Sequence, residues 1–343
     1  MVQIDNSKST LHILQDQSDL ITWYEEHRRE LPWRKNKDPY QIWISEVMLQ
    51  QTTVAAVIPF YEKFMKRFPN LKTLSKAKES DVIEYWAGLG YYSRARNLHK
   101  AATQMAEGNF PGTAAELIQY PGFGPYTSRA VASLAFSEKV GVLDGNVIRV
   151  LSRRYGLELN WWNSKEKDVL QKISDQLAQT EKNSEMNQGL MELGATVCTP
   201  KKPICLLCPW KQRCVALKMN LVELLPRPKP RQVGEIWQWT VTPHIKKDKI
   251  FLTPLITSPF LKNVYFPEST LKKVSKKPKN FHIKHGVTKY DLYISVESPT
   301  AALSPALLKQ GRWVKLDQVK QLNPTSLMTK ILNFSKNNGN LKG

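Results

Sequence analysis

Two patterns of apolar spacing divide this chain. Through residues 9–225, apolar side chains recur at three- and four-residue intervals, the period of a helix with one buried face. Proline and glycine interrupt the pattern repeatedly, so it predicts a succession of helices rather than one long helix. The clearest helical segments are residues 38–68, 95–107, 127–136, 146–155 and 165–180.

The pattern changes at residues 226–232, where three prolines alternate with basic residues. Alternating prolines keep a backbone extended, so this segment is predicted to be a stiff linker. Beyond it, apolar residues alternate with period two at residues 237–242, 250–255 and 290–296, which is typical of strands. We therefore expect a mainly α protein with a helical domain over residues 1–225 and a smaller α+β domain over residues 233–343.

The charge of the chain is uneven. Its formal net charge is +20, and residues 226–343 hold 21 of the 50 Lys and Arg but only 6 of the 30 Asp and Glu. A field of this sign attracts polyanions, nucleic acid first, although a solvated lysine-rich surface would have the same composition. No run of 18 apolar residues exists and no basic amphipathic helix is evident, so a membrane partner is not expected.

All four cysteines lie in one window of 17 residues, with six, two and five residues between them. Thiolates at such spacing bind an iron–sulfur cluster or zinc. Zinc sites usually have two close cysteine pairs and this window has one, so the spacing favours a [4Fe–4S] cluster. The polar N-terminus gives no sign of an oxidising compartment, which makes disulfides the weaker interpretation. The expected ligands are Cys198, Cys205, Cys208 and Cys214.

A glycine-containing turn between two helical segments supplies a candidate phosphate site. Gly122 and Gly124 lie two residues apart, and a helix follows them whose first N–H groups lack helical partners. An ordinary helix–helix turn would have the same sequence. Asp144 follows 18 residues after Tyr126, at the start of another helix, where an N-cap is the commoner role.

These features together resemble the helix-hairpin-helix superfamily of DNA glycosylases, in its endonuclease III branch. Three further segments narrow the resemblance to the MutY family of adenine DNA glycosylases: residues 31–34 (LPWR), 38–52 and 86–98 (WAGLGYYSRARNL). The resemblance covers residues ~20–225 densely. It implies a helix-hairpin-helix glycosylase fold with a [4Fe–4S] cluster loop over residues 198–214, followed by a Nudix-like domain.

Two carboxyls are expected to do the chemistry. Adenine leaves deoxyribose only when it is protonated, and the cationic sugar needs a nearby negative charge. Glu46 lies in an apolar helical segment, so burial should raise its pKa and keep it protonated as the acid. The resemblance implies that Glu46 protonates the base and then activates water, and that Asp144 stabilises the sugar cation, aided by Tyr126 and Asn146.

The resemblance also implies residues that handle the duplex. Gln51 and Tyr91 would wedge into the base stack, and Trp33, Arg34 and Glu192 would form the adenine pocket. Core packing for the aromatic residues and a helix-face charge for Glu192 remain alternatives.

Tyr126 and two lysines carry further expectations. Bifunctional relatives have a lysine at the position of Tyr126 that forms a Schiff base, and tyrosine cannot, so a monofunctional enzyme is expected. Lys201 and Lys202, held between prolines in the cluster loop, are expected to contact DNA phosphates.

The C-terminal domain matches the family less well. Residues 287–289, Val-Thr-Lys, occupy the place of a loop that reads 8-oxoguanine in the family, and Thr288 could still hydrogen-bond a base edge. No cluster of glutamates suitable for a Nudix hydrolase site is present, so pyrophosphatase activity is not expected.

The expected protein is therefore a monomeric, monofunctional base excision repair enzyme. It would hydrolyse the N-glycosidic bond of adenine mispaired with 8-oxoguanine or guanine in double-stranded DNA, and would be cytoplasmic and nucleoid-associated in a bacterium. Three alternatives stay open: a bifunctional glycosylase for oxidised pyrimidines, a thymine glycosylase for T·G mismatches, and a non-catalytic iron–sulfur DNA-binding module.

Overall fold

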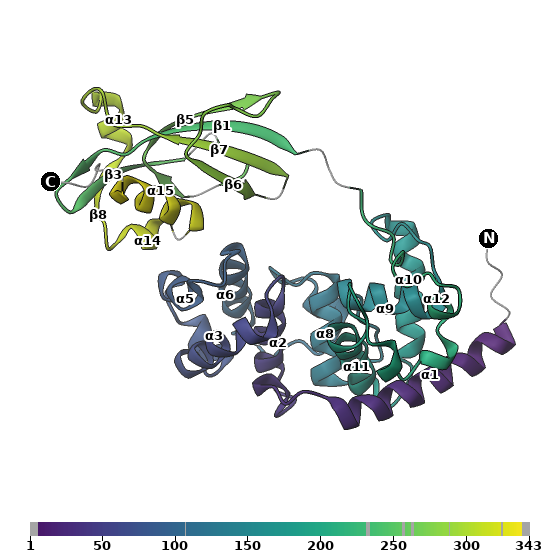
Figure 1. The fold of residues 1–343 in the computed structure, drawn as a ribbon. Helices are drawn as coiled ribbons and strands as arrows, with labels where there is room; N and C mark the ends of the chain where they lie inside the picture. The colour runs from purple at the N-terminus through teal and green to yellow at the C-terminus, as the bar shows by residue number, and fades with distance from the viewer. Residues whose placement is uncertain are drawn as a thin grey trace. The chain divides into compact units, whose positions relative to one another are not determined.

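The computed structural model describes residues 6–106, 108–230, 234–255, 258–261, 264–287, 289–323 and 325–337. The chain divides into two compact units, Met1–Lys229 and Pro230–Gly343, at a point inside the proline-rich segment. The first unit runs from purple to green in Figure 1 and the second from green to yellow. No helix in the described ranges is long and apolar enough to cross a membrane.

The first unit consists of helices. Its α-helices are α1 (Asn6–His27), α2 (Pro39–Leu49), α3 (Val54–Arg67), α4 (Leu71–Ser75), α5 (Glu79–Trp86), α6 (Ser93–Met105), α7 (Ala114–Leu117), α8 (Pro125–Phe136), α9 (Gly145–Tyr155), α10 (Ser164–Leu177), α11 (Asn183–Thr196) and α12 (Val215–Lys218). Short 3-10 helices are η1 (Pro32–Arg34), η2 (Cys205–Leu207) and η3 (Lys211–Arg213). The helices predicted over residues 127–136, 146–155 and 165–180 are confirmed as α8, α9 and α10.

The predicted helical segment 38–68 is two helices rather than one. The helix α2 ends at Leu49, and Gln51 adopts a left-handed conformation with φ of 58° before α3 begins at Val54. Arg94 explains the break, because its guanidinium donates to the carbonyl oxygens of Val47 and Gln50 at 2.6 and 2.7 Å. Carbonyls satisfied in this way do not require another helical turn.

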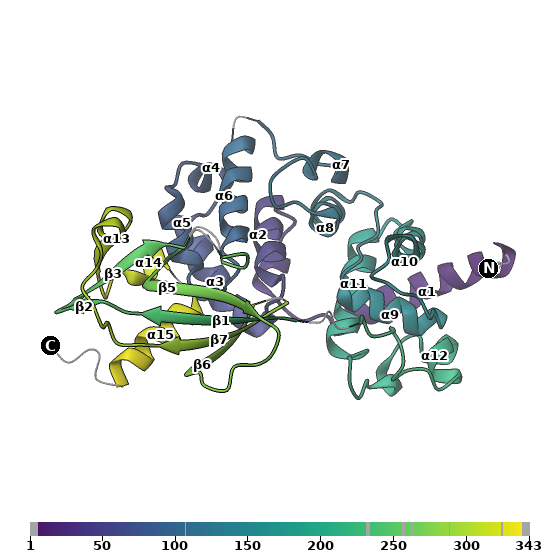
Figure 2. The same cartoon turned by 90° about the horizontal axis from the view of Figure 1, so that it is seen from above.

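Two apolar cores hold the first unit together. One is made by residues 31–134, with Trp43 and Trp86 among its fully buried side chains. The other joins α1 to residues 142–210, because α1 packs against α10 and α11 (Figure 2). The helix α8 contributes to both cores, with Ala130 in one and Val131 in the other. The first unit therefore has two halves that share α8.

A buried carboxylate ties the N-terminal helix to the cysteine segment. Asp16 of α1 is fully buried and pairs with Arg154 of α9 at 2.9 Å and with Arg213 at 3.2 Å. Tyr155 donates its hydroxyl to the same carboxylate at 2.9 Å, and Trp210 donates its indole N–H to the Asp16 carbonyl at 3.0 Å. These bonds fix the cysteine segment on the second half of the unit.

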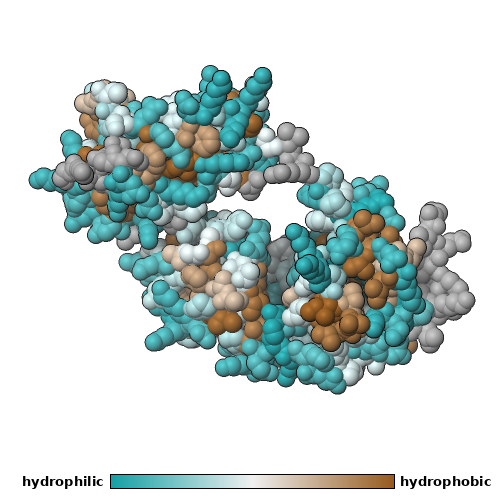
Figure 3. Space-filling model, viewed as in Figure 1, coloured by the Kyte–Doolittle hydropathy of each residue, from teal (hydrophilic) through white to brown (hydrophobic). Residues whose placement is uncertain are grey.

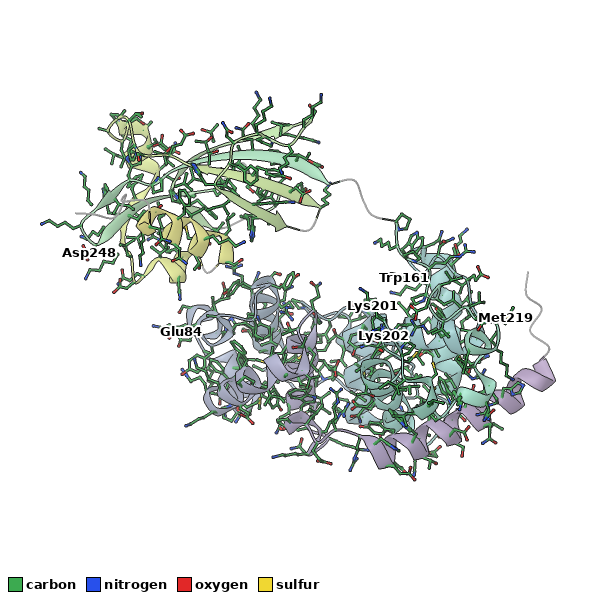
Figure 4. The ribbon with its side chains drawn as sticks, in the orientation of Figure 1. Glu84, Trp161, Lys201, Lys202, Met219 and Asp248 are labelled. Carbon is green, nitrogen blue, oxygen red and sulfur yellow. The ribbon has the colours of Figure 1, made fainter. Side chains whose placement is uncertain are left out.

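The start of the predicted linker is anchored to the first unit. Arg227 forms an ion pair with Glu158 at 2.9 Å, and Trp161, labelled in Figure 4, donates its indole N–H to the Arg227 carbonyl at 2.9 Å. Residues 231 and 232 of the linker lie outside the described ranges.

The second unit is a mixed α+β fold. Its strands are β1 (Glu235–Thr242), β2 (Ile245–Lys246), β3 (Lys249–Pro254), β4 (Tyr265–Phe266), β5 (Glu268–Val274), β6 (Ile283–Val287), β7 (Tyr290–Val296) and β8 (Arg312–Lys315), and its helices are α13 (Pro305–Gln310), α14 (Val319–Leu322) and α15 (Ser326–Asn337). One sheet has the order β5-β1-β7-β6, with β1 parallel to β7 and the other pairs antiparallel. The other has the order β2-β3-β4, with β8 also paired to β3. The strands predicted over residues 237–242, 250–255 and 290–296 are confirmed as β1, β3 and β7.

Period-two alternation explains the core of this unit. Along β1, Trp239 and Val241 are fully buried, and their parallel neighbours Ile294 and Val296 on β7 are buried with them. The helix α15 packs on β6 and β7 and adds Leu327 to the same cluster. On the face seen in Figure 3 the surface of this unit is largely hydrophilic, as its excess of lysine requires.

Replacing Asp16 with Asn is expected to lower the free energy of unfolding by about 3 kcal/mol, because two arginines lose their buried counter-charge. Urea unfolding followed by far-UV circular dichroism measures this. Asp168→Asn is the matched control: its ion pair with Lys172 is exposed, so a change of about 0.5 kcal/mol or less is expected. Equal losses in the two variants would contradict a role for Asp16 in joining α1 to the cysteine segment.

Candidate active site

One cavity of about 1340 Å³ is lined by residues from both halves of the first unit. The residues predicted from the sequence that line it are Trp33, Arg34, Glu46, Gln51, Gly122, Gly124, Tyr126, Asp144, Asn146 and Glu192. Trp33 and Glu192, which lie 159 positions apart in the sequence, thus share one site.

Glu46 is held inside the cavity by α2. Asp38 caps this helix by accepting from the N–H groups of Tyr40 and Gln41, and Pro39 occupies its first position. The Glu46 side chain has apolar neighbours on its own helix and an exposed fraction of 6%. Burial raises the pKa of Glu46 to about 7, as expected from the sequence.

Three polar groups modulate the pKa of Glu46. Tyr126 donates its hydroxyl to Glu46 Oε2 at 2.7 Å, which lowers the pKa, and the charge of Arg34 also lowers it. The negative charge of Asp144 raises it. The effect of burial is the largest, so a substantial fraction of the carboxyl remains protonated at neutral pH.

Asp144 is both a helix cap and a wall of the cavity. Its Oδ1 accepts from the backbone N–H of Val147 at 2.8 Å, and its Oδ2 accepts from the Asn146 side-chain amide at 3.0 Å. Burial raises the pKa of Asp144, while these hydrogen bonds act in the opposite direction. Gly194 of α11 allows this close packing, because a Cβ there would lie 2.6 Å from the Asn146 Cβ.

Glu192 is ion-paired rather than free. Its side chain has an exposed fraction of 1%, and it pairs with Arg29 at 2.5 Å and Arg34 at 2.9 Å. Burial alone would raise the pKa of Glu192, but the hydrogen bonds and charges of the two arginines outweigh it and lower the pKa. The sequence analysis missed Arg29, whose partner lies 163 residues away along the chain.

Trp33 belongs to the core as well as to the cavity. It is 6% exposed and packs edge-on against Tyr61, with ring centroids 5.2 Å apart. The alternative of core packing is therefore observed, without removing Trp33 from the cavity wall.

The turn before α8 leaves that helix open at its N-terminus. Gly122 has a φ of 86°, and a Cβ there would lie 3.0 Å from the Asn97 Cβ, so glycine is required. Gly124 is the N-cap of α8 and offers no side-chain cap to the first turn. The N–H groups of Tyr126 and Thr127, in the first turn of this 12-residue helix, therefore remain available to an anion.

Gln51 and Tyr91 lie on two loops joined by Arg94. Both are exposed, Tyr91 to 55%, and both have a positive φ, of 58° and 48°. Arg94 donates to the Gln50 carbonyl at 2.7 Å, and its guanidinium lies over the Tyr91 ring at 5.3 Å. Arg94 thus orients both loops, a role that the sequence analysis did not assign. Tyr91 is not among the residues that line the cavity.

The four cysteines line a second, separate cavity with Arg153, Pro203 and Lys211. None forms a disulfide. Arg153 donates to the Cys198 sulfur at 3.5 Å, and Arg149 donates to the Cys198 carbonyl at 2.7 Å. Within the described ranges, no three His, Cys, Asp or Glu side chains are grouped as a site for a metal ion.

Two predicted DNA contacts lie on the surface near these cysteines. Lys201 and Lys202, both exposed, are labelled in Figure 4, and Lys202 has a φ of 49°.

In the second unit, Val287 ends β6 opposite Tyr290 and Lys289 forms an ion pair with Glu235 at 3.1 Å. Thr288 lies outside the described residues.

Comparisons with known proteins agree with this fold. The model of the HhH-GPD superfamily base excision DNA repair proteins matches residues 44–179. The adenine DNA glycosylase of Buchnera aphidicola subsp. Acyrthosiphon pisum is 41% identical over 201 residues, which cover 57% of this chain and 57% of that protein. The human adenine DNA glycosylase is 40% identical over 234 residues, covering 63% of this chain and 43% of that protein. The chain thus spans about half the length of the curated relatives it matches.

Solved structures show the same fold. A thermostable thymine-DNA glycosylase matches with a TM-score of 0.56 and 29% identity, covering 63% of this chain and all of that chain. An endonuclease III in a non-covalent DNA complex matches with a TM-score of 0.53 and 21% identity, covering 64% of this chain and 99% of that chain.

Residues 44–179 therefore match the helix-hairpin-helix domain of the HhH-GPD superfamily of base excision DNA repair proteins. Within that superfamily the chain resembles the adenine DNA glycosylases, so the resemblance inferred from its motifs is confirmed.

The buried carboxyl should make the protein less stable as the pH rises. Glu46 ionises near its ordinary pKa of 4.5 when unfolded but only at about 7 when folded, so the folded state holds an extra proton between these values. Stability then falls through this window, by about 3 kcal/mol at pH 8. Glu46→Gln removes this cost, and is expected to raise the free energy of unfolding by about that amount at pH 8 and little at pH 4.5.

Urea unfolding of both proteins at the two pH values measures the difference. Glu84→Gln is the control, because Glu84 is exposed on α5 (Figure 4). A Glu46→Gln variant no more stable than wild type at pH 8 would argue against a desolvated carboxyl.

Proposed function

We propose that this protein is a monofunctional adenine DNA glycosylase of base excision repair. One observation carries the proposal: the two carboxyls of Glu46 and Asp144 face one cavity from opposite halves of the unit, in contrasting environments. Burial raises the pKa of Glu46 to about 7, which suits an acid that must hold its proton until a base needs it. Asp144 accepts two hydrogen bonds from N–H donors, which favour its ionised form.

The reaction follows from these roles. Glu46 donates its proton to a ring nitrogen of the flipped adenine, which turns the base into a neutral leaving group. The carboxylate of Asp144 faces the sugar and stabilises its positive charge as the glycosidic bond breaks. Glu46, now ionised, accepts a proton from the water that attacks the sugar. Asn146 and Tyr126 keep the two carboxyls in position through the hydrogen bonds described above.

The absence of an amine at position 126 supports the monofunctional assignment. Strand cleavage in bifunctional relatives depends on a lysine Schiff base, and the phenol of Tyr126 cannot form an imine. The product would be an intact strand with an abasic site.

The adenine pocket would be formed by Trp33, Arg34 and Glu192. The Arg29–Glu192–Arg34 ion pairs present a rigid polar edge, which suits recognition of a flipped base by hydrogen bonds. Gln51 and Tyr91, exposed on the loops that Arg94 orients, would enter the base stack and hold the flipped state.

The four cysteines fit a [4Fe–4S] cluster. All four line one small cavity together with Arg153 and Lys211, and four thiolates gathered at one place are the usual ligand set of such a cluster. The cluster would cross-link the cysteine segment and so fix its loop, while the glycosidic chemistry belongs to Glu46 and Asp144. Arg153 and Arg149 would support the ligand Cys198 from outside.

Duplex DNA is the proposed substrate. The open N-terminus of α8, Lys201, Lys202 and the lysine-rich second unit offer cationic contacts to phosphates. The second unit is proposed to be a Nudix-like domain that reads the base opposite adenine. In its hairpin the charge of Lys289 is already compensated by Glu235, so Lys289 is a weaker phosphate contact than an unpaired lysine.

Single-turnover cleavage tests the function. Duplexes with adenine opposite 8-oxoguanine, guanine or thymine are incubated with excess protein, with or without alkali, together with a G·T duplex. Alkali-dependent cleavage at adenine, fastest opposite 8-oxoguanine, is expected, with a loss of at least about 10³-fold in Glu46→Gln, which keeps the shape of the side chain but not its proton.

Other outcomes point to the alternatives. Cleavage of the G·T duplex alone would favour a thymine glycosylase, which the likeness to a solved thymine-DNA glycosylase keeps in view. Cleavage without alkali would contradict the monofunctional assignment.

Lys201→Ala with Lys202→Ala is expected to weaken DNA binding about tenfold while leaving the single-turnover rate at saturation unchanged, because two phosphate contacts are lost. Fluorescence anisotropy and single-turnover kinetics measure the two quantities. Lys76→Ala with Lys78→Ala, two residues apart on the first unit, is a control for nonspecific charge. A slower chemical step with unchanged affinity would contradict the assigned role.

A further inference from the structure

The Tyr126 hydroxyl lies between two acceptors. Glu46 Oε2 is 2.7 Å from the phenol oxygen, and the thioether sulfur of Met191 is 3.0 Å from it. A phenol has one proton, so it donates to one of these groups at a time, while its oxygen can accept from another donor. Met191 also lines the cavity, and the sequence analysis assigned it no role.

The ionisation of Glu46 decides which bond forms. A carboxylate only accepts, and it binds the phenol proton strongly because the hydrogen bond is charge-assisted. A protonated carboxyl can donate its own O–H to the phenol oxygen, and the phenol proton is then free to turn toward Met191. The Met191 sulfur therefore accepts the hydrogen bond of the Tyr126 hydroxyl only when Glu46 is protonated.

We propose that Met191 is a positioning residue. By accepting a hydrogen bond from the Tyr126 hydroxyl, it favours the protonated, base-releasing form of Glu46. The proposal rests on the acid role of Glu46 in the proposed function. It adds to that role a relay of two hydrogen bonds, from Glu46 to Tyr126 and from Tyr126 to Met191.

The packing of Met191 supports this role. It is half-buried and contacts both cores of the first unit, so its sulfur is held in place beside Tyr126. It extends from α11 next to Glu192, whose charge is compensated by two arginines. Met191 therefore offers Tyr126 an uncharged acceptor. The neighbouring Glu192 carboxylate on the same helix adds no uncompensated charge beside it.

The other groups that face Glu46 act through charge. Asp144 favours the protonated form, and Arg34 favours the ionised form. Neither effect depends on the Met191 sulfur, so removing the sulfur should shift the protonation equilibrium of Glu46 in one direction only, toward the ionised form.

The pH dependence of single-turnover adenine release tests the proposal in wild type, Met191→Leu and Met191→Gln. Leucine has a similar volume but no acceptor, so the alkaline limb of the profile should move down by about half a pH unit, the effect of losing a weak acceptor. Glutamine offers a carbonyl oxygen at similar reach, so its limb should lie at or above that of wild type. An unmoved limb in Met191→Leu would overturn the proposal.

Tyr126→Phe separates hydrogen bonding from packing. Without the hydroxyl, Met191→Leu has no bond left to remove and should cause no further shift in a double-mutant cycle. A shift of equal size in both backgrounds would mean that Met191 acts by packing, which would also overturn the proposal. The Tyr126→Phe limb alone should move up, because Glu46 loses a donor that favours ionisation.

A second readout is independent of substrate. Titration of the Glu46 carboxyl carbon by ¹³C NMR, assigned with Glu46→Gln, should show a lower midpoint in Met191→Leu than in wild type. If wild type releases no adenine, the proposed function fails while this titration still decides the relay. If adenine is released and neither limb nor midpoint moves, only the relay fails.

Discussion

The exclusion of water from the Glu46 carboxyl is the constraint on which the site depends. It requires an apolar helix beneath the carboxyl, a second core across the cavity, and α8 shared between the two. Neither half could supply that environment alone. The two-core architecture therefore keeps the Glu46 carboxyl protonated. Burying this carboxyl lowers the free energy of unfolding, and the apolar packing of the same two cores offsets that loss.

Three carboxyls around one cavity, two of them buried and that of Asp144 half-buried, illustrate how environment assigns roles. Among the described residues, Glu46 meets only the neutral hydroxyl of Tyr126 within hydrogen-bonding distance, Asp144 meets N–H donors, and Glu192 meets two guanidiniums. The pKa is raised in the first two and lowered in the third. In the proposed function, identical chemical groups thus serve as a proton reservoir, a countercharge and a fixed anchor.

The sequence predicted what depends on local pattern. Helical period located α8, α9 and α10, period two located β1 and β7, and the apolar run around Glu46 predicted its raised pKa. It missed Arg29, Arg94 and Met191, whose roles depend on partners far away in the chain. The break after α2 escaped prediction for the same reason, since the Arg94 guanidinium that caps α2 lies 44 residues beyond Gln50.

Among the described residues, six non-glycine residues have a positive φ, and Gln51, Tyr91 and Lys202 are three of them. All three are exposed and are proposed to contact the duplex. A left-handed conformation costs a side-chain-bearing residue about 1 kcal/mol, which glycine would avoid. If these residues contact the duplex as proposed, replacing them with glycine would therefore yield a protein that is harder to melt but poorer at extracting a base. The strain at these three positions would then limit how far the protein can be stabilised without losing its hold on DNA.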